Sequence, residues 1–429
     1  MNDREPFIYI KQMYMKGFFD LEENCKEKII SEDYWDFIIP LYRDEELKEV
    51  NPENVCIQEM DFGYKSVSVD RRILLPLSFR EYWYSTIPKC YALLDMQPLD
   101  AAGIITLQNY PTLQLMGDGI MIGFLDTGID YQNRVFRNLD GTTRIVGIWD
   151  QTIQTGRTPQ GLYYGTEYTE EMINAALRSE DPLQIVPSVD TDGHGTFVAS
   201  AAAGGAEVGK RFLGAAPEAS IAMVKLKPAK NYLKEFFVIA QDAVCYQEND
   251  IMLGLRYLND LARKQGMPLV ICVALGTSFG GHNGDSLLAD ILDIYATVRN
   301  RCVVVGTGNE AARRHHYFNR FTDAQDMRTA EIRVGEGTQS FAVELWSTLP
   351  NIVMVSVTSP SGERTGMIPI RLGYLFDFLF TFERTTITVE YRLLQENNDA
   401  QLVFIRFQNA VPGIWKIDIK PAMQTTGDF

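Results

Sequence analysis

Basic residues are in short supply in this chain of 429 residues, in which 40 Lys and Arg stand against 56 Asp and Glu. The net charge of −16 repels phosphate, so we expect no binding to nucleic acid. Long hydrophobic runs are also lacking, since the stretch from Met267 to Leu275 is far too short to cross a bilayer. The N-terminus has no basic segment followed by an apolar stretch. The sequence therefore predicts no membrane attachment and no signal peptide.

Cysteine is sparse too, with six residues that form no Cys-x-x-Cys pair and no regular spacing. We expect from them neither a metal site nor a disulfide framework. Cys272 and Cys302 stand in apolar runs, which predicts reduced, buried thiols. We interpret His282, His315 and His316 as loop or surface histidines, because two adjacent histidines on a helix cannot face one ion. We expect no cofactor, and calcium binding by loop carboxylates is left open.

Three patterns follow one another along the chain. Up to about residue 95, helical and strand-like segments are mixed with many charges. From about 96 to 325, short apolar strands alternate with helical patterns, which is typical of a parallel α/β fold. From 326 on, short alternating segments separated by turn residues indicate an antiparallel β-sandwich. The strands expected in the middle region are near-continuous apolar runs, typical of strands covered on both faces: 119–125, 220–224, 269–275 and 302–305.

Two motifs of the middle region place a titratable side chain beside glycine turns. Asp126 ends a buried apolar strand and is followed by Thr-Gly, so its carboxylate is held rigidly enough to orient an imidazole; alone, it could equally be a turn cap. His194 lies in Asp-Gly-His-Gly-Thr, at the start of a helical run of small residues. A lone histidine is usually structural, but this position exposes the ring as a general base requires.

A third motif, Gly-Thr-Gly-Asn309-Glu, follows another apolar strand. Its amide could donate to a developing oxyanion, or the motif could be merely a turn. In this order the three motifs resemble the subtilase (S8) family over about residues 96–325. The resemblance implies that Asp126 orients and stabilises His194, that His194 is the general base, and that Asn309 is the oxyanion donor. It also implies that the backbone at Leu275 and Gly276 lines the cleft and pairs with an extended peptide substrate.

The connecting segments resemble more closely the Csp germination proteases of clostridial spores, notably in 122–152, 164–177, 224–230 and 247–262. That resemblance implies a subtilisin-like parallel sheet core (96–325, incomplete), an N-terminal α+β prodomain (1–95) and an inserted jelly-roll β domain (326–429), also incomplete. The prodomain would fold the protein and block its own cleft until it is cleaved between residues 75 and 100. We expect a cytoplasmic or spore-associated protein.

The nucleophilic serine of this family is not found where its order requires. It should follow Asn309 in Gly-Thr-Ser-x-Ala-x-Pro and open a buried helix. The one Gly-Thr-Ser, ending at Ser278, precedes Asn309 and leads into a glycine-rich stretch, so we reject it as the nucleophile. The serines after Asn309 all fall in the expected β-sandwich: Ser340, Ser347, Ser356, Ser359 and Ser361. The chain alone should therefore be inactive or nearly so.

Three hypotheses remain open. In the first, the chain is the N-terminal portion of a serine endopeptidase whose serine lies beyond Phe429. In the second, it is a pseudoprotease that binds, scaffolds or signals in germination. In the third, a second chain supplies the serine. The retention of Asp126, His194 and Asn309 favours an enzyme, and the missing serine favours the pseudoprotease.

Overall fold

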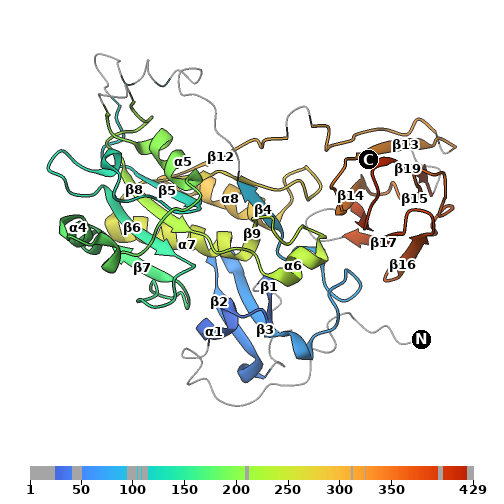
Figure 1. Ribbon diagram of the computed structural model, residues 1–429, viewed down its shortest axis with the longest axis horizontal. Helices are drawn as coiled ribbons and strands as arrows, with labels where there is room; N and C mark the ends of the chain where they lie inside the picture. Colours follow the sequence, from blue (N-terminus) through green and yellow to red (C-terminus); the bar gives the residue numbers. More distant parts are fainter. Residues whose placement is uncertain are drawn as a thin grey trace.

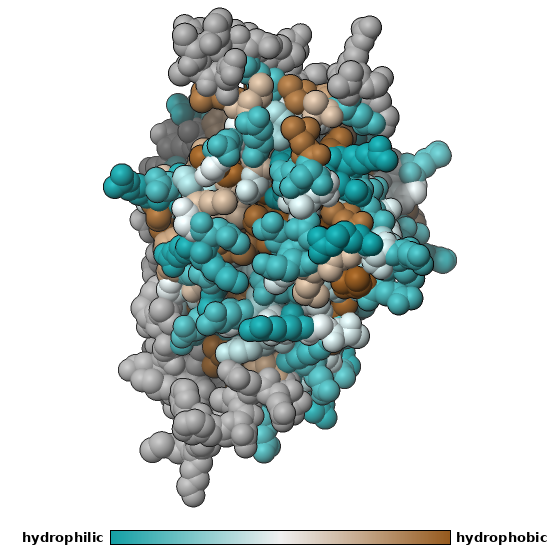
Figure 2. All heavy atoms as spheres, turned by 90° about the vertical axis from the view of Figure 1, so that its left-hand side faces the viewer, coloured by the Kyte–Doolittle hydropathy of each residue, from teal (hydrophilic) through white to brown (hydrophobic). Residues whose placement is uncertain are grey.

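The structure, a computed structural model, describes residues 25–40, 51–93, 104, 108, 115–207, 212–310, 313–323, 325–394 and 400–422. Figure 1 shows a small N-terminal sheet, a central sheet flanked by helices, and a group of C-terminal strands on the far side of the N-terminal sheet from α4 and β7. Figure 2 views the molecule from the side of α4 and β7, where hydrophilic side chains cover most of the surface. In the described part of the chain, no helix is long and apolar enough to span a membrane.

The central sheet has six strands in the order β12-β10-β5-β8-β6-β7, and only β7 runs antiparallel to its neighbour. The strands are β5 (Met121–Asp126), β6 (Ile145–Asp150), β7 (Thr166–Thr169), β8 (Ser220–Lys225), β10 (Leu269–Val273) and β12 (Arg301–Val305). The helices are α4 (Glu170–Arg178), α5 (His194–Ala203), α6 (Asn231–Phe236), α7 (Glu248–Gln265) and α8 (Leu287–Thr297).

Helices cover both faces of this sheet. Met121 and Leu125 of β5 belong to the same apolar cluster as residues of α7 and α8. Ile122 and Phe124, which point the other way, pack with residues of α4 and α5. The parallel α/β architecture and the four expected strands are thus confirmed. The sequence reading missed β6 and β7.

The expectation of coverage on both faces is wrong for β12. This strand lies at the edge of the sheet, where Val304 and Val305 are about half exposed, 51% and 56%. Cys302 is exposed as well, so the prediction of a buried thiol is wrong there, while Cys272 on the neighbouring β10 is half-buried. An apolar run shows that a strand is suited to burial, but its neighbours decide whether it is buried.

The N-terminal sheet has the antiparallel order β1-β3-β2, from β1 (Tyr34–Pro40), β2 (Val55–Glu59) and β3 (Tyr64–Asp70). The short helix α1 (Cys25–Ile30) packs against it. A disulfide joins Cys25 of α1 to Cys56 of β2. We expected no disulfide framework, and this single link between elements 31 residues apart corrects that reading in part.

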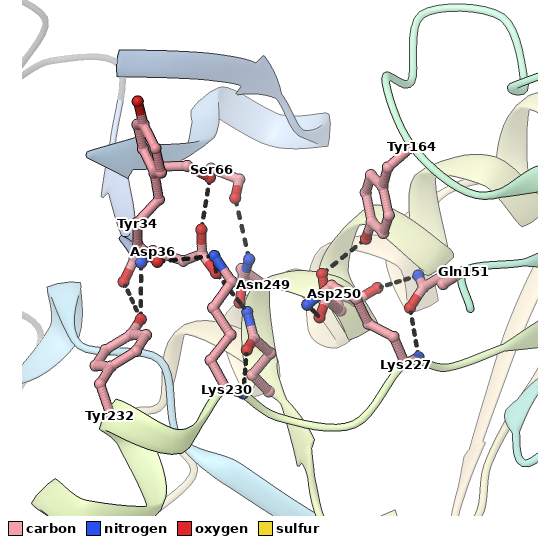
Figure 3. A network of polar contacts seen from close by, with 12 residues as sticks. Tyr34, Asp36, Ser66, Gln151, Tyr164, Lys227, Lys230, Tyr232, Asn249 and Asp250 are labelled. Atoms are coloured by element: carbon pink, nitrogen blue, oxygen red, sulfur yellow. Dashed lines mark hydrogen bonds and ion pairs between the residues drawn. The ribbon is translucent and has the colours of Figure 1, made fainter. Parts of the chain in front are cut away.

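Buried polar contacts hold the N-terminal sheet on the core (Figure 3). The carboxylate of Asp36, on β1, lies 2.9 Å from the ammonium of Lys230 and accepts a hydrogen bond of 2.8 Å from the Gln247 amide. Asn249, in the first turn of α7, donates to the hydroxyl of Ser66 on β3. All five side chains are buried, so the contact specifies one docked arrangement of the two parts.

The C-terminal strands form two antiparallel sheets, β13-β19-β15 and β14-β18-β17-β16. Their bounds are β13 (Arg328–Val334), β14 (Ser340–Thr348), β15 (Val353–Thr358), β16 (Leu375–Phe380), β17 (Thr385–Leu394), β18 (Ala400–Gln408) and β19 (Gly413–Pro421). Both sheets contribute to one apolar cluster, with Trp415 and Phe407 fully buried in it. The division of the chain at residues 95 and 325, and the jelly-roll assignment, stay predictions.

Candidate active site

Asp126 and His194 meet at the edge of the sheet where β5 ends. The Nδ1 atom of His194 lies 2.8 Å from Oδ1 and 3.0 Å from Oδ2 of Asp126. Asp126 is 1% exposed, and its Oδ1 also accepts a hydrogen bond from the backbone N–H of Thr127. An imidazole that donates from Nδ1 to a buried carboxylate keeps Nε2 as its basic atom. Asp126 can therefore orient the imidazole of His194, which can accept a proton at Nε2.

Close backbone packing at His194 requires the glycine that follows it. A Cβ on Gly195 would lie 2.2 Å from the carbonyl oxygen of Gly128 and 3.0 Å from Oδ1 of Asp126. The preceding Gly193 has a φ of 90°, in the left-handed region that glycine tolerates best. These two glycines let α5 begin directly against the turn after β5, which brings the ring to the carboxylate.

Asp190 is a site residue that the sequence reading missed. Its carboxylate accepts hydrogen bonds from the backbone N–H groups of Gly193, at the N-cap of α5, and of Thr196, in its first turn. It also accepts from the hydroxyls of Thr127 and Thr196. Burial alone would raise the pKa of Asp190, but these hydrogen bonds hold its pKa below the ordinary 3.8. Asp190 thus ties the turn after β5 to the start of α5. The only available signal was an Asp four residues before His194, too common to single out.

Asn309 lies in the turn after β12, with an exposed side chain. Because β12, β10 and β5 are parallel neighbours, this turn is at the same sheet edge as Asp126. The oxyanion role of Asn309 stays a prediction.

Leu275 and Gly276 form the short strand β11 (Leu275–Gly276), and an extended segment pairs with it. That segment is β4 (Cys90–Leu93) of the same chain, which lies antiparallel between β11 and β9 (Tyr246–Gln247). Leu93 is opposite Leu275, and Cys90 is opposite Gln247. We call β4 and its two neighbours the cleft sheet. Burial, and after it the charges of Asp126, Asp192 and Asp190, raise the pKa of Tyr246, which places β9 within electrostatic reach of the Asp126–His194 pair.

The serines weighed as nucleophiles in the sequence, Ser278 and the five after Asn309, do not begin helices. Ser278 is in the loop between β11 and α8, where its carbonyl accepts a hydrogen bond from His282. The five serines after Asn309 lie in β14, in β15 or in the turn after β15.

The other histidines lie on the surface. The ring of His282 stacks on that of His316, and Nδ1 of His315 lies 2.6 Å from a carboxylate oxygen of Glu310. Within the described residues, no group of three or more His, Cys, Asp or Glu is placed to hold a metal ion.

Comparisons with known proteins agree with this geometry. The model of the subtilase family matches residues 117–365. Among solved structures, the chain is similar to the CspB protease of Clostridium perfringens, with a TM-score of 0.64 and 29% identity. That match covers 76% of this chain and 64% of the other, so the chain spans less than two thirds of that protease. The comparison with curated proteins gave no match.

Proposed function

Because the chain belongs to the subtilase family of serine proteases and is close to the Csp proteases, we propose that it carries the Asp–His part of an endopeptidase active site. The observation that carries the proposal is the contact of 2.8 Å between Nδ1 of His194 and the buried carboxylate of Asp126. The reaction is acyl transfer from a peptide bond to a serine and then to water.

In this mechanism, His194 takes the proton of a serine hydroxyl at Nε2 as the hydroxyl attacks the peptide carbonyl. Asp126 holds the required tautomer and stabilises the imidazolium that forms. Asn309 and the serine backbone N–H donate to the oxyanion, and loss of one such donor costs about 10²–10³ in rate. His194 then returns the proton to the leaving amine.

We assign the serine to a C-terminal segment or a second chain that packs on β12. This edge strand presents exposed Val304 and Val305, an unusual surface for a strand of a parallel sheet. A segment that covers β12 would also lie near the turn that carries Asn309.

The cleft sheet supports the role of the N-terminal region as an inhibitor. An extended substrate binds a cleft by adding a strand to it, and β4 adds such a strand between β9 and β11. The polypeptide substrate would take the place of β4. The same occupied cleft favours the second candidate, a pseudoprotease that binds without cleaving and acts as a scaffold or in germination signalling.

The deciding experiment is to sequence the natural reading frame past the codon for Phe429 and to express its whole product. We expect Gly-Thr-Ser-x-Ala downstream, labelling of the whole product by a fluorophosphonate, and no labelling of residues 1–429 alone. In the whole product, His194→Ala should lower kcat on the order of 10⁶-fold. His315→Ala, which removes an exposed histidine, should leave kcat unchanged. A frame without that serine would refute the hydrolase and leave the pseudoprotease.

A further inference from the structure

Glu248 is a fully buried carboxylate at the start of α7, beside the segment that fills the cleft. Its Oε2 accepts a hydrogen bond of 3.2 Å from the backbone N–H of Lys89, and the Lys89 ammonium lies 3.7 Å away. Its Oε1 accepts a hydrogen bond of 3.3 Å from the hydroxyl of Tyr91. From the core itself, the backbone N–H of Leu288 donates to Oε1. The segment 89–91 thus provides most of the donors for this carboxylate.

The backbone of the cleft sheet fixes which side chains reach Glu248. The N–H of Glu248 donates to the carbonyl of Lys89 over 2.9 Å, so the ladder between β4 and β9 continues to that residue. Side chains alternate along the strand. Tyr91 accordingly packs in the cluster that holds Leu275 and residues of α7 and α8, whereas Cys90 packs in the other cluster. Lys89 and Tyr91 share one face, and Glu248 lies under both.

Burial makes this arrangement selective. Lys89 and Tyr91 are 4% and 7% exposed, and Glu248 is 0% exposed. A peptide without a lysine at the place of Lys89 would leave the carboxylate of Glu248 without a compensating charge. A peptide without a hydroxyl at the place of Tyr91 would remove a hydrogen bond to Glu248 that water cannot replace. A site built to bind a hydroxyl discriminates strongly against an analogue that lacks it.

We propose that Glu248 is a specificity-determining residue, which selects peptides that carry Lys-x-Tyr at the positions taken by Lys89 and Tyr91. This inference rests on the proposed function in one respect, that a substrate occupies the place of β4. The substrate class is an extended peptide with a lysine two residues before a tyrosine.

The first test uses the full chain and measures hydrogen exchange of residues 90–93 by mass spectrometry. Tyr91→Phe removes one hydroxyl and should speed exchange there about tenfold. Glu248→Met keeps a long side chain without carboxylate acceptors. In a Glu248→Met chain, Tyr91→Phe should therefore not speed the exchange of residues 90–93 any further. Tyr82→Phe is the matched control, since the buried Tyr82 donates to the carbonyl of Leu75 and not to Glu248. It should leave exchange of 90–93 unchanged.

An equal effect of Tyr91→Phe in both backgrounds would overturn the proposal, because the hydroxyl would then act independently of Glu248.

If Glu248→Met does not fold, a second test needs only the unaltered chain. Peptides of sequence Thr-Ile-Pro-Lys-Ser-Tyr-Ala-Leu, at millimolar concentration to compete with a tethered strand, should displace β4 and speed its exchange. The same peptide with Phe for Tyr, or with Met for Lys, should need an about tenfold higher concentration to displace β4.

Equal displacement by the Tyr and Phe peptides would refute the selectivity. Neither test requires a serine nucleophile, so a failed hydrolase proposal would leave both results valid. Conversely, an active protease that cleaves Phe and Tyr peptides with the same kcat/KM would refute Glu248 selectivity and leave the hydrolase intact.

Discussion

At the scale of single residues, Asp190 shows how a side chain outside the Asp126–His194 pair controls the geometry of the pair. It accepts four hydrogen bonds, two from backbone N–H groups at the N-cap and in the first turn of α5 and two from threonine hydroxyls. Thr127, one of these donors, in turn accepts from the N–H of Gly195. The residues on both sides of the Asp126–His194 contact are therefore joined through one carboxylate.

Asp190→Asn should lower the free energy of unfolding by about 1–2 kcal/mol at pH 7, because an amide cannot accept from all four donors. The folded-state pKa of Asp190 is below the ordinary 3.8, so the ionised carboxylate stabilises the fold above that value. Its contribution is lost as pH falls through the folded-state pKa. Urea unfolding of the parent and of Asp190→Asn from pH 7 down to 3 measures the difference between their free energies of unfolding. That difference should shrink below about pH 4. Glu180→Gln, at an exposed position, should show little difference at any pH. A difference independent of pH would contradict the role of the charge.

At the scale of elements, α7 and β5 approach each other through a reciprocal pair of glycines. A Cβ on Gly254 of α7 would lie 2.3 Å from Cδ2 of Leu125, and a Cβ on Gly123 of β5 would lie 2.8 Å from Cδ1 of Leu258. Each leucine thus fills the space that the opposite glycine leaves. Leu125 immediately precedes Asp126, so this packing fixes the end of the strand that carries the carboxylate.

Gly254→Ala should destabilise the protein by about 1–3 kcal/mol through overpacking, although alanine favours a helix by about 1 kcal/mol. Both leucines are fully buried and have little room to move. Gln265→Ala, at the exposed end of α7, should change stability by less than about 0.5 kcal/mol. Denaturant unfolding measures both. A Gly254→Ala protein that is more stable than the parent would show that Leu125 repacks freely.

At the scale of the whole molecule, contacts between segments far apart in sequence hold three groups of strands together. Asp36 of the N-terminal sheet pairs with Lys230 of the core, and both are at most 3% exposed. Glu344 of β14 accepts hydrogen bonds from the hydroxyl of Tyr84 and from the backbone N–H of Gly280, which follows β11. Burial, opposed by these and other hydrogen bonds, raises the pKa of Glu344. The C-terminal sheets thus contact both the N-terminal region and the loop beside the cleft.

Lys230→Met should cost about 3–5 kcal/mol of stability, because it leaves Asp36 charged and buried without its partner. The double change Asp36→Asn with Lys230→Met should recover part of that loss. Lys264→Met, at an exposed position of α7, is the control. Thermal unfolding combined with protease susceptibility of residues 25–93 reports the outcome. Simple additivity of the two single changes would show that the ion pair does not couple the N-terminal sheet to the core.

Local sequence determined the parallel α/β core and the two polar residues, Asp126 and His194, that meet where β5 ends. The apolar run that ends at Asp126 and the glycines around His194 are local signals, because strand burial and turn conformation depend mainly on adjacent residues. Long-range packing decided the rest. Cys302 lies in an equally apolar run, yet it is exposed because β12 has a neighbour on one side only.

Only the tertiary structure could reveal the contacts of Asp190 and Glu248. Thr127 and Asp190 are 63 residues apart, and Tyr91 and Glu248 are 157 apart. Acidic side chains are ordinarily exposed, so nothing in the local sequence marks Glu248 as buried or Asp190 as half-buried. The surroundings of both carboxylates follow from where β4, β9 and α5 pack, and a pattern of adjacent residues carries no information on which distant donors will meet a carboxylate.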